Sequence, residues 1–165
     1  MISNPENSAT RIRAAYETEA PELSAIAYQS KAYWAYSADQ LAAWRDDLTI
    51  SPDTISSSLV YVAEIDATVA GFYVLQSSME HWVLEHFWVL PSHMGHGVGR
   101  ALLAHASSVA AEGGAKAISI DADPHAEIFY LAFGARRIAT IPAPLQDAPD
   151  RVRPQMLLPV KTDHN

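Results

Sequence analysis

The sequence predicts an α/β fold, layered in the α+β manner, around a mixed β-sheet. The chain has 165 residues, of which 49% are hydrophobic and 18% are charged, as expected for one globular domain with a sizeable core. Predicted strands come first as a meander and then alternate with helices, an order that favours a mixed sheet. We therefore expect a single domain over residues 1–165, with a flexible tail at 1–9.

The first half of the chain predicts one strand, two helices and a hairpin. Pro21 marks the start of the first helix and Ser37 is a suitable N-cap for the second. Asp66 lies near the turn between two apolar runs, which indicates a hairpin. The expected elements are a strand at 10–17, helices at 21–34 and 37–48, a short turn beginning at 51–53, and strands at 59–65 and 70–77.

The second half predicts strands that alternate with helices. Asp123 can cap the last helix, Pro124 can open it and Gly134 can close it. The helix before it ends at Gly113-Gly114 and has one apolar face, made by Leu102, Leu103, Ala106, Val109 and Ala110. The other expected elements are strands at 81–90, 116–122 and 136–141, a helix at 125–133, a proline-rich loop at 142–154 and a last strand at 155–160.

Composition excludes several classes of protein. The chain has no cysteine, so it carries neither a disulfide framework nor thiolate metal ligands. Its net charge of −8 is not offset by a basic cluster, which argues against nucleic acid as a partner. Neither a membrane-spanning run nor a signal-peptide core is present in the sequence, so we expect a cytoplasmic protein without a membrane partner. The pair His93-x-x-His96 lacks further ligands at suitable spacing, and we expect no metal.

Three glycines open the helix that follows the strand at 81–90. Gly95, Gly97 and Gly99 alternate with larger residues in the stretch PSHMGHGVGRALL. The first N–H groups of a helix have no partner within it, and the helix dipole adds partial positive charge there. Glycines let an anion such as a phosphate approach these groups. The alternative is a tight turn that needs positive φ angles.

Two well-known phosphate motifs do not fit this stretch. The dinucleotide fingerprint requires G-x-G-x-x-G within a βαβ unit, whereas the spacing here is G-x-G-x-G after a hairpin. The P-loop requires a lysine after its last glycine, and Arg100 stands at that position.

The stretch FWVLPSHMGHGVGRALLAHA resembles the acyl-CoA-binding motif of the GNAT superfamily of N-acetyltransferases, Gln/Arg-x-x-Gly-x-Gly/Ala after a strand. Met94, Gly97 and Gly99 occupy the motif positions, and Met94 departs from the expected Gln or Arg. A second block, DPHAEIFYLAFGARRI, resembles the family's downstream motif. There Ala126, Phe129, Tyr130 and Gly134 match, while Asp123 stands for Asn and Ala135 for Phe. The resemblance covers nearly the whole chain.

The resemblance implies a mostly antiparallel sheet of six to seven strands with helices on both faces. It also implies that acetyl-CoA (CoA) is the cofactor, with its pyrophosphate on the glycine turn and its pantetheine arm along the preceding strand. The N–H of Val89 is then the candidate for polarising the thioester carbonyl. The expected cofactor-binding residues are Phe87, Val89, Met94, Gly95, His96, Gly97, Val98, Gly99 and Arg100.

The resemblance implies a role for one catalytic residue, Tyr130, and leaves the general base to be inferred from the sequence. Tyr130 matches the tyrosine near the cofactor sulfur and is expected to donate a proton or to orient the sulfur. Glu85 and His86 interrupt a strand that should be apolar if both its faces are covered. A buried carboxylate can accept a proton from an amine, so Glu85 is the expected base and His86 the second choice. A solvated Glu85 and a mechanism without a dedicated base remain alternatives.

The acceptor is a primary amine that the sequence does not identify: a small molecule, a peptide N-terminus or a lysine. In the family the N-terminal helices build its pocket, and we expect Trp34 and Tyr36 to contribute through their rings, although ordinary packing explains them equally well. A homodimer is compatible with the sequence. The alternative to an N-acetyltransferase acting in a ternary complex is a catalytically silent acyl-CoA-binding or sensing module.

Overall fold

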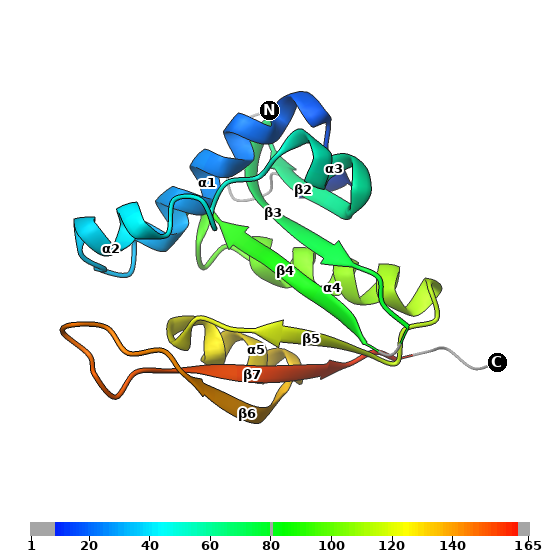
Figure 1. Cartoon of the computed structure of the whole chain (residues 1–165). Helices are drawn as coiled ribbons and strands as arrows, with labels where there is room; N and C mark the ends of the chain where they lie inside the picture. The colour runs from blue at the N-terminus through cyan, green and yellow to red at the C-terminus, as the bar shows by residue number, and fades with distance from the viewer. Residues whose placement is uncertain (1–8, 80, 162–165) are drawn as a thin grey trace. The chain divides into compact units, whose positions relative to one another are not determined.

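The structure is a computed structural model that describes residues 9–79 and 81–161 (Figure 1). The chain divides into two compact units. The N-terminal unit comprises residues 1–74 and 86–105, and the C-terminal unit comprises 75–85 and 106–165. Of the predicted flexible tail at 1–9, only the last residue is described. No helix in the described ranges is long and apolar enough to cross a membrane.

The strands form one sheet of seven strands in the order β1-β2-β3-β4-β5-β7-β6. Antiparallel pairs join β1 to β2, β5 to β7 and β6 to β7, whereas β4 and β5 are parallel. This arrangement confirms the predicted mixed and mostly antiparallel sheet. The strands are β1 (Arg11–Ala14), β2 (Leu59–Ile65), β3 (Thr68–Gln76), β4 (Trp82–Val89), β5 (Ala117–Asp121), β6 (Arg136–Pro142) and β7 (Val152–Pro159).

The N-terminal unit contains helices α1 (Ala20–Ala32), α2 (Ala38–Ala43) and α3 (Pro52–Ser57) and the short 3-10 helix η2 (Glu17–Glu19). Ser37 caps α2 as predicted, because its hydroxyl accepts a hydrogen bond from the N–H of Gln40 at 3.1 Å. Helix α2 nevertheless ends five residues earlier than expected. The predicted turn at 51–53 is the first turn of α3, which Ser51 caps through the N–H of Thr54.

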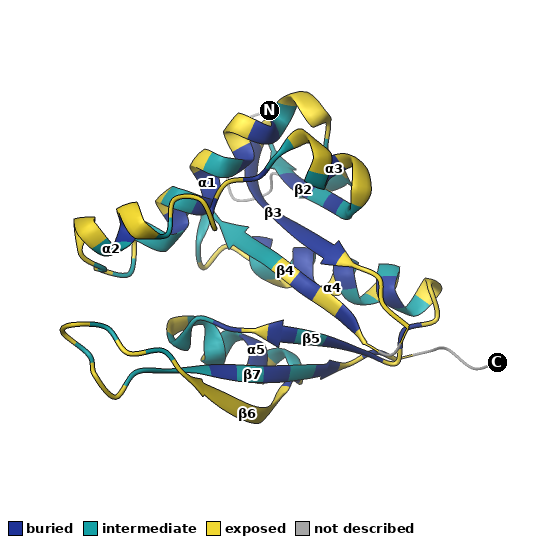
Figure 2. Cartoon of the chain, in the orientation of Figure 1, coloured by how far each residue is buried: buried dark blue, intermediate teal, exposed yellow. Residues whose placement is uncertain are grey.

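The core of this unit lies where α1 and α3 pack on β2 and β3. Strand β3 is buried along nearly its whole length, as Figure 2 shows. Burying aliphatic and aromatic side chains is the dominant favourable term in folding. The core cluster consists of Ala20, Leu23, Ile26, Ala27, Leu48, Ile50, Ile55, Val60, Val62, Val69, Phe72 and Val74.

Helix α4 (Val98–Glu112) follows the glycine turn and contributes residues to both units. Its predicted apolar face is buried except for Val109, which is partly exposed. In the C-terminal unit, the predicted helix at 125–133 is a 3-10 turn η4 (Pro124–Ala126) followed by α5 (Glu127–Phe133). Gly134 ends α5 with a φ of 112°, a left-handed conformation that favours glycine.

The proline-rich loop is shorter than predicted. Strand β6 extends to Pro142 and β7 begins at Val152, so the predicted loop at 142–154 and the strand start at 155 are both wrong. Pro154 lies within β7, although proline is rare in central strands. It is tolerated because it lies beyond the last β5–β7 pair, Asp121–Gln155, where the missing N–H removes no bond to β5.

Arg13 joins β1, η2 and β2 through charged hydrogen bonds. Its Nε donates to Glu64 at 2.8 Å, and its two terminal nitrogens donate to the two oxygens of Glu19 at 2.9 Å each. Glu19 also accepts the N–H of Tyr16 at 2.8 Å. These hydrogen bonds hold the pKa of Glu19 below its ordinary value. Removing the guanidinium would leave two partly buried carboxylates without their cation.

We predict that Arg13→Gln lowers the free energy of unfolding by about 1.5–3 kcal/mol at pH 7. Because the pKa of Glu19 is lowered on folding, the stabilisation is present above the unfolded pKa of a glutamate and is lost as the pH falls through the folded value. The difference from wild type should therefore narrow in acid. Urea unfolding from pH 3 to pH 7 measures it, with Arg11→Gln on the same strand as the charge-matched control. Equal losses in both variants would contradict the prediction.

Candidate active site

The glycine turn leads from the 3-10 turn η3 (Pro91–His93) into α4. Gly95 and Gly97 have φ angles of 78° and 85°, which side-chain-bearing residues rarely adopt. A Cβ built on either glycine would meet no atom within 4 Å. The tight turn given as the alternative is therefore present, and the space in front of it is open at both glycines.

The start of α4 presents backbone donors beside this turn. The carbonyl of Gly97 accepts the N–H of Ala101 at 3.0 Å, so the N–H groups of the intervening first turn precede the helical hydrogen-bond pattern. Val98 is fully buried and anchors the turn, whereas His96 and Arg100 are exposed. The structure thus gathers the predicted residues 94–100 around one helix N-terminus, where partial positive charge favours an anion.

Strand β4 has different hydrogen-bonding neighbours along its length. Its parallel pairing with β5 ends at Leu84, opposite Ile120. Beyond its far end, the N–H of Leu90 donates to Ala70 on β3 at 2.8 Å. Because successive N–H groups of a strand point to opposite sides, the N–H of Val89 points away from β3. This orientation is the one that backbone pairing with an extended ligand requires.

Two residues hold the backbone on either side of Val89 in place. Ser30 on α1, a buried polar residue, has its hydroxyl 2.8 Å from the carbonyl of Val89 and 2.7 Å from that of Ile26, and its single proton serves these two acceptors. On β3, a Cβ at Gly71 would lie 2.6 Å from the carbonyl oxygen of Trp88 and 3.2 Å from the Cα of Val89. Sequence analysis missed both residues; the signals were a glycine inside a strand and a serine on the buried face of α1.

The predicted burial of Glu85 is wrong. Trp82 and Leu84 are buried, whereas Val83 and Glu85 are exposed, so this part of β4 alternates between a covered and an uncovered face. The expectation of two covered faces applies to wholly parallel sheets, and this sheet is mostly antiparallel. Glu85 therefore lies on the uncovered face of β4.

His86 is neutral and acts as a hydrogen-bond acceptor. The indole Nε1–H of Trp88 donates to Nδ1 of His86 at 3.1 Å, which places the imidazole proton on Nε2. Burial lowers the pKa of His86 below its ordinary value, against the opposing effect of Asp47. Protonation at Nδ1 would break the bond from Trp88, so the structure disfavours His86 as the base.

Tyr130 lies on α5 in the C-terminal unit and is almost completely buried. The ring of Phe129 contacts it edge to face, with centroids 5.4 Å apart. Burial, and then the negative charge of Asp123, raise the pKa of the Tyr130 hydroxyl above its ordinary value. The hydroxyl therefore stays protonated at physiological pH and is able to donate a hydrogen bond.

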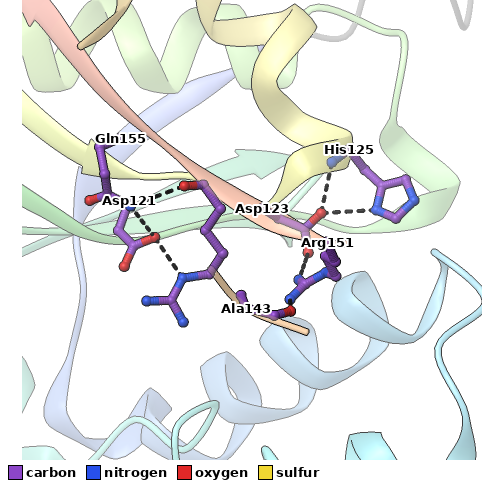
Figure 3. A network of polar contacts seen from close by, with 7 residues as sticks. Asp121, Asp123, His125, Ala143, Arg151 and Gln155 are labelled. Atoms are coloured by element: carbon purple, nitrogen blue, oxygen red, sulfur yellow. Dashed lines mark hydrogen bonds and ion pairs between the residues drawn. The ribbon is translucent and has the colours of Figure 1, made fainter. Parts of the chain in front are cut away.

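A polar network surrounds the start of η4 (Figure 3). Asp123 caps the turn as predicted, accepting the N–H of His125 at 2.8 Å, and the same oxygen lies 2.9 Å from Nδ1 of the His125 ring. A terminal nitrogen of Arg151 is 3.8 Å from the other oxygen of Asp123, and Arg151 also donates to the carbonyl of Ala143 at 3.1 Å. Sequence analysis predicted the cap but not the imidazole pair.

A second carboxylate lies in the same network, on β5. Asp121 accepts hydrogen bonds from Arg153 and Gln155, each at 3.0 Å.

No group of three histidine, aspartate or glutamate side chains suited to a metal ion occurs among residues 9–79 and 81–161.

The aromatic residues after α1 surround one of the protein's own cations. The ammonium group of Lys31 lies 5.0 Å from the ring centroid of Tyr36 and 4.5 Å from that of Trp44, and these two rings meet edge to face. Trp34 instead contacts Tyr33, with centroids 4.9 Å apart. The ring of Tyr36 therefore already contacts a cation, and sequence analysis missed the contribution of Trp44.

If the chain binds acetyl-CoA, as its resemblance to the GNAT superfamily implies, we predict that Gly71→Ala weakens this binding as well as stability. The new methyl group would approach the Trp88 carbonyl to about 2.6 Å, so the end of β4 must shift. A displaced Val89 peptide should raise KM for acetyl-CoA several-fold more than the loss of stability alone explains. Steady-state kinetics well below the melting temperature measures this, and an unchanged KM would show that the position of Val89 is unimportant.

Comparisons with known proteins place the chain in a family. The model of the acetyltransferase (GNAT) family matches residues 12–135. No curated protein matches the chain.

Solved structures with the same fold are numerous. PaiA N-acetyltransferase from Thermoplasma acidophilum, in complex with coenzyme A, is 17% identical over 92% of this chain and 99% of its own, with a TM-score of 0.74. YncA, a putative acetyltransferase from Salmonella typhimurium with acetyl-CoA, is 19% identical over 96% and 97%, with a TM-score of 0.68. An alanine N-acetyltransferase of a ribosomal protein from Escherichia coli is 18% identical over 95% and 97%, with a TM-score of 0.71. At these identities the likeness establishes the fold.

Proposed function

Because the chain belongs to the GNAT family of acetyltransferases, we propose that it moves an acetyl group from acetyl-CoA directly to a primary amine in a ternary complex. The observation that carries this proposal is the glycine turn at the start of α4, with an open face at Gly95 and Gly97. Acetyl-CoA is the cofactor of the family, and the enzyme is an acyltransferase.

The cofactor-binding residues are proposed to be those of the turn and of the end of β4. Residues 94–100 supply backbone donors for the pyrophosphate, with Arg100 and His96 exposed beside them. Phe87 and Val89 supply the strand edge for the pantetheine arm. Backbone donors suit a chain of net charge −8, because they attract an anion without a lysine cluster.

The acetyl transfer requires an electrophilic carbonyl and a stabilised leaving group. The N–H of Val89 is proposed to polarise the thioester carbonyl, and its fixed peptide supports this role because a preorganised donor costs no reorganisation. Tyr130 is proposed to donate a hydrogen bond to the leaving thiolate. Its raised pKa favours stabilising this thiolate over fully protonating it, since an ordinary thiol, with a pKa of about 8.5, is the stronger acid.

Glu85 remains a predicted base, now as an exposed carboxylate that would reach the amine directly or through water. For the acceptor we propose a primary amine of a small molecule, a peptide N-terminus or a lysine, with Trp34 and Tyr36 contributing to its pocket. Since Lys31 lies over Tyr36 and Trp44, a cationic acceptor would have to share or replace that contact. The net charge of −8 argues against nucleic acid as a partner, and a cytoplasmic location and a homodimer stay predictions.

The decisive experiment is acetyl-CoA turnover with a panel of amines. Thiol release would be measured with alkyl diamines, amino acid amides, and peptides that carry either an N-terminal alanine or an internal lysine. Turnover of any of these supports the enzyme. Binding of acetyl-CoA without turnover of any amine would instead identify a catalytically silent acyl-CoA-binding module.

We predict that Gly97→Glu abolishes the stabilisation of the protein by CoA, while Gly97→Ala only weakens it. Both substitutions strain a position with a φ of 85°, but only glutamate places a carboxylate where the pyrophosphate is proposed to lie. CoA bound to the folded state alone raises the melting temperature by mass action. Thermal shifts of the two variants with CoA test the assignment. A folded glutamate variant with the wild-type shift would show that the turn does not bind CoA.

We predict that Tyr130→Phe lowers kcat by about 10- to 100-fold while the affinity for CoA changes by no more than a few-fold. The ring and its packing against Phe129 remain, so the melting temperature should change little. Kinetics at saturating acceptor, together with CoA titration, separate the two effects. An unchanged kcat would remove the hydroxyl from the mechanism.

A further inference from the structure

The side chains of Asp123 and His125 form a carboxylate–imidazole pair in the C-terminal unit. One oxygen of Asp123 lies 2.9 Å from Nδ1 of His125, and the same oxygen accepts the backbone N–H of that residue at 2.8 Å (Figure 3). The aspartate side chain is 12% exposed, whereas the imidazole is 42% exposed. The carboxylate is thus shielded while the ring reaches solvent.

The carboxylate sets the tautomer of the imidazole. An ionised aspartate is an acceptor only, so Nδ1 of His125 must carry the hydrogen in this contact. In the neutral ring the lone pair then lies on Nε2, the nitrogen on the opposite side of the ring. A carboxylate on Nδ1–H also stabilises the imidazolium that forms when Nε2 takes up a proton.

The same carboxylate acts on Tyr130. The negative charge of Asp123 is the second cause of the raised pKa of that hydroxyl, after burial. The pair therefore lies in the electrostatic neighbourhood of the residue proposed to stabilise the leaving thiolate.

We propose that His125, in place of Glu85, is the general base that takes the proton of the acceptor amine, and that Asp123 is its positioning residue. This inference rests on the proposed N-acetyltransferase function. As the amine nitrogen forms its bond to the acetyl carbon, the amine proton passes to Nε2 of His125. The bond between carbon and sulfur breaks, and the thiolate leaves with a hydrogen bond from Tyr130 before it takes a proton from solvent.

Other charged groups surround the pair. Arg151, from the segment before β7, lies 3.8 Å from the second oxygen of Asp123 and balances part of its charge. On α5, Glu127 is neutralised by its ion pair with Arg137. On β5, Asp121 is held by Arg153. Asp123 contacts the imidazole directly, and Arg151, Arg137 and Arg153 balance the charges of the three carboxylates Asp123, Glu127 and Asp121.

The test compares His125→Gln with wild type in kcat/KM for the acceptor, from pH 5.5 to pH 8.5. The acceptor is the amine with the highest turnover in the panel described above. If His125 is the base, the ratio of wild-type to variant rates rises as an imidazole loses its proton, and reaches about 10²-fold or more. Taking the ratio cancels the titration of the amine itself. His81→Gln, at another exposed histidine, is the control and should match wild type.

A double-mutant cycle tests the role of Asp123. Asparagine also caps helices well, so Asp123→Asn should fold normally but lower kcat/KM. In the His125→Gln background the same change should cost little, because the carboxylate acts through the imidazole. Additive losses would show that Asp123 acts elsewhere, for example on Tyr130, and would overturn its positioning role.

The outcomes separate this inference from the proposed function. Turnover by wild type with a constant ratio for His125→Gln across the pH range would overturn the base assignment and leave the acetyltransferase intact. The kcat/KM of wild type is expected to fall at low pH, where the base is protonated. If this fall disappears in Glu85→Gln but persists in His125→Gln, the base is Glu85 and the inference is overturned. Absence of turnover by wild type with every amine of the panel would overturn the proposed function and this inference together.

Discussion

The position of one peptide group, at Val89, is the constraint on which the proposed chemistry depends. Strand β4 approaches β3 so closely at Gly71 that no side chain fits there, and the hydroxyl of Ser30 is 2.8 Å from the Val89 carbonyl. The first contact positions the Trp88–Val89 peptide, which carries the Val89 N–H, and the second positions the following Val89–Leu90 peptide, so the packed core of the N-terminal unit holds the backbone on both sides of Val89. A hydrogen-bond donor fixed in advance is worth more to a developing charge than one that must be ordered during the reaction.

In the proposed mechanism, backbone groups and a few oriented side chains carry the binding and catalytic roles of this acidic chain. The helix dipole at the start of α4 supplies partial positive charge, although the whole chain has a net charge of −8. In the C-terminal unit, Asp123 combines three effects. It caps η4, its charge adds to the effect of burial in raising the pKa of Tyr130, and it sets the tautomer of His125. Asp123 therefore contacts the backbone of η4 and the ring of His125, and its charge acts on the hydroxyl of Tyr130.

Local signals in the sequence predicted the elements that local physics determines. Ser37 and Asp123 cap helices because their side-chain oxygens accept N–H groups only two or three residues away. Gly97 and Gly134 adopt positive φ angles that other residues avoid. Predictions failed where the sheet decided the outcome. Pro154 lies in β7 because of its place beyond the end of β5, and Glu85 is exposed because β4 is covered on one face there.

The sequence by itself therefore determined the fold class, the order of the elements, the glycine turn and the family, because each depends on short-range patterns of capping, periodicity and spacing. Only the tertiary structure decided which distant side chains come into contact. Ser30 and Val89 are separated by 59 residues, Lys31 meets Trp44 after a helix–helix turn, and Arg151 approaches Asp123 across β6 and its loop. Such contacts form when the chain packs, and no periodic pattern in the sequence indicates which distant residues will meet.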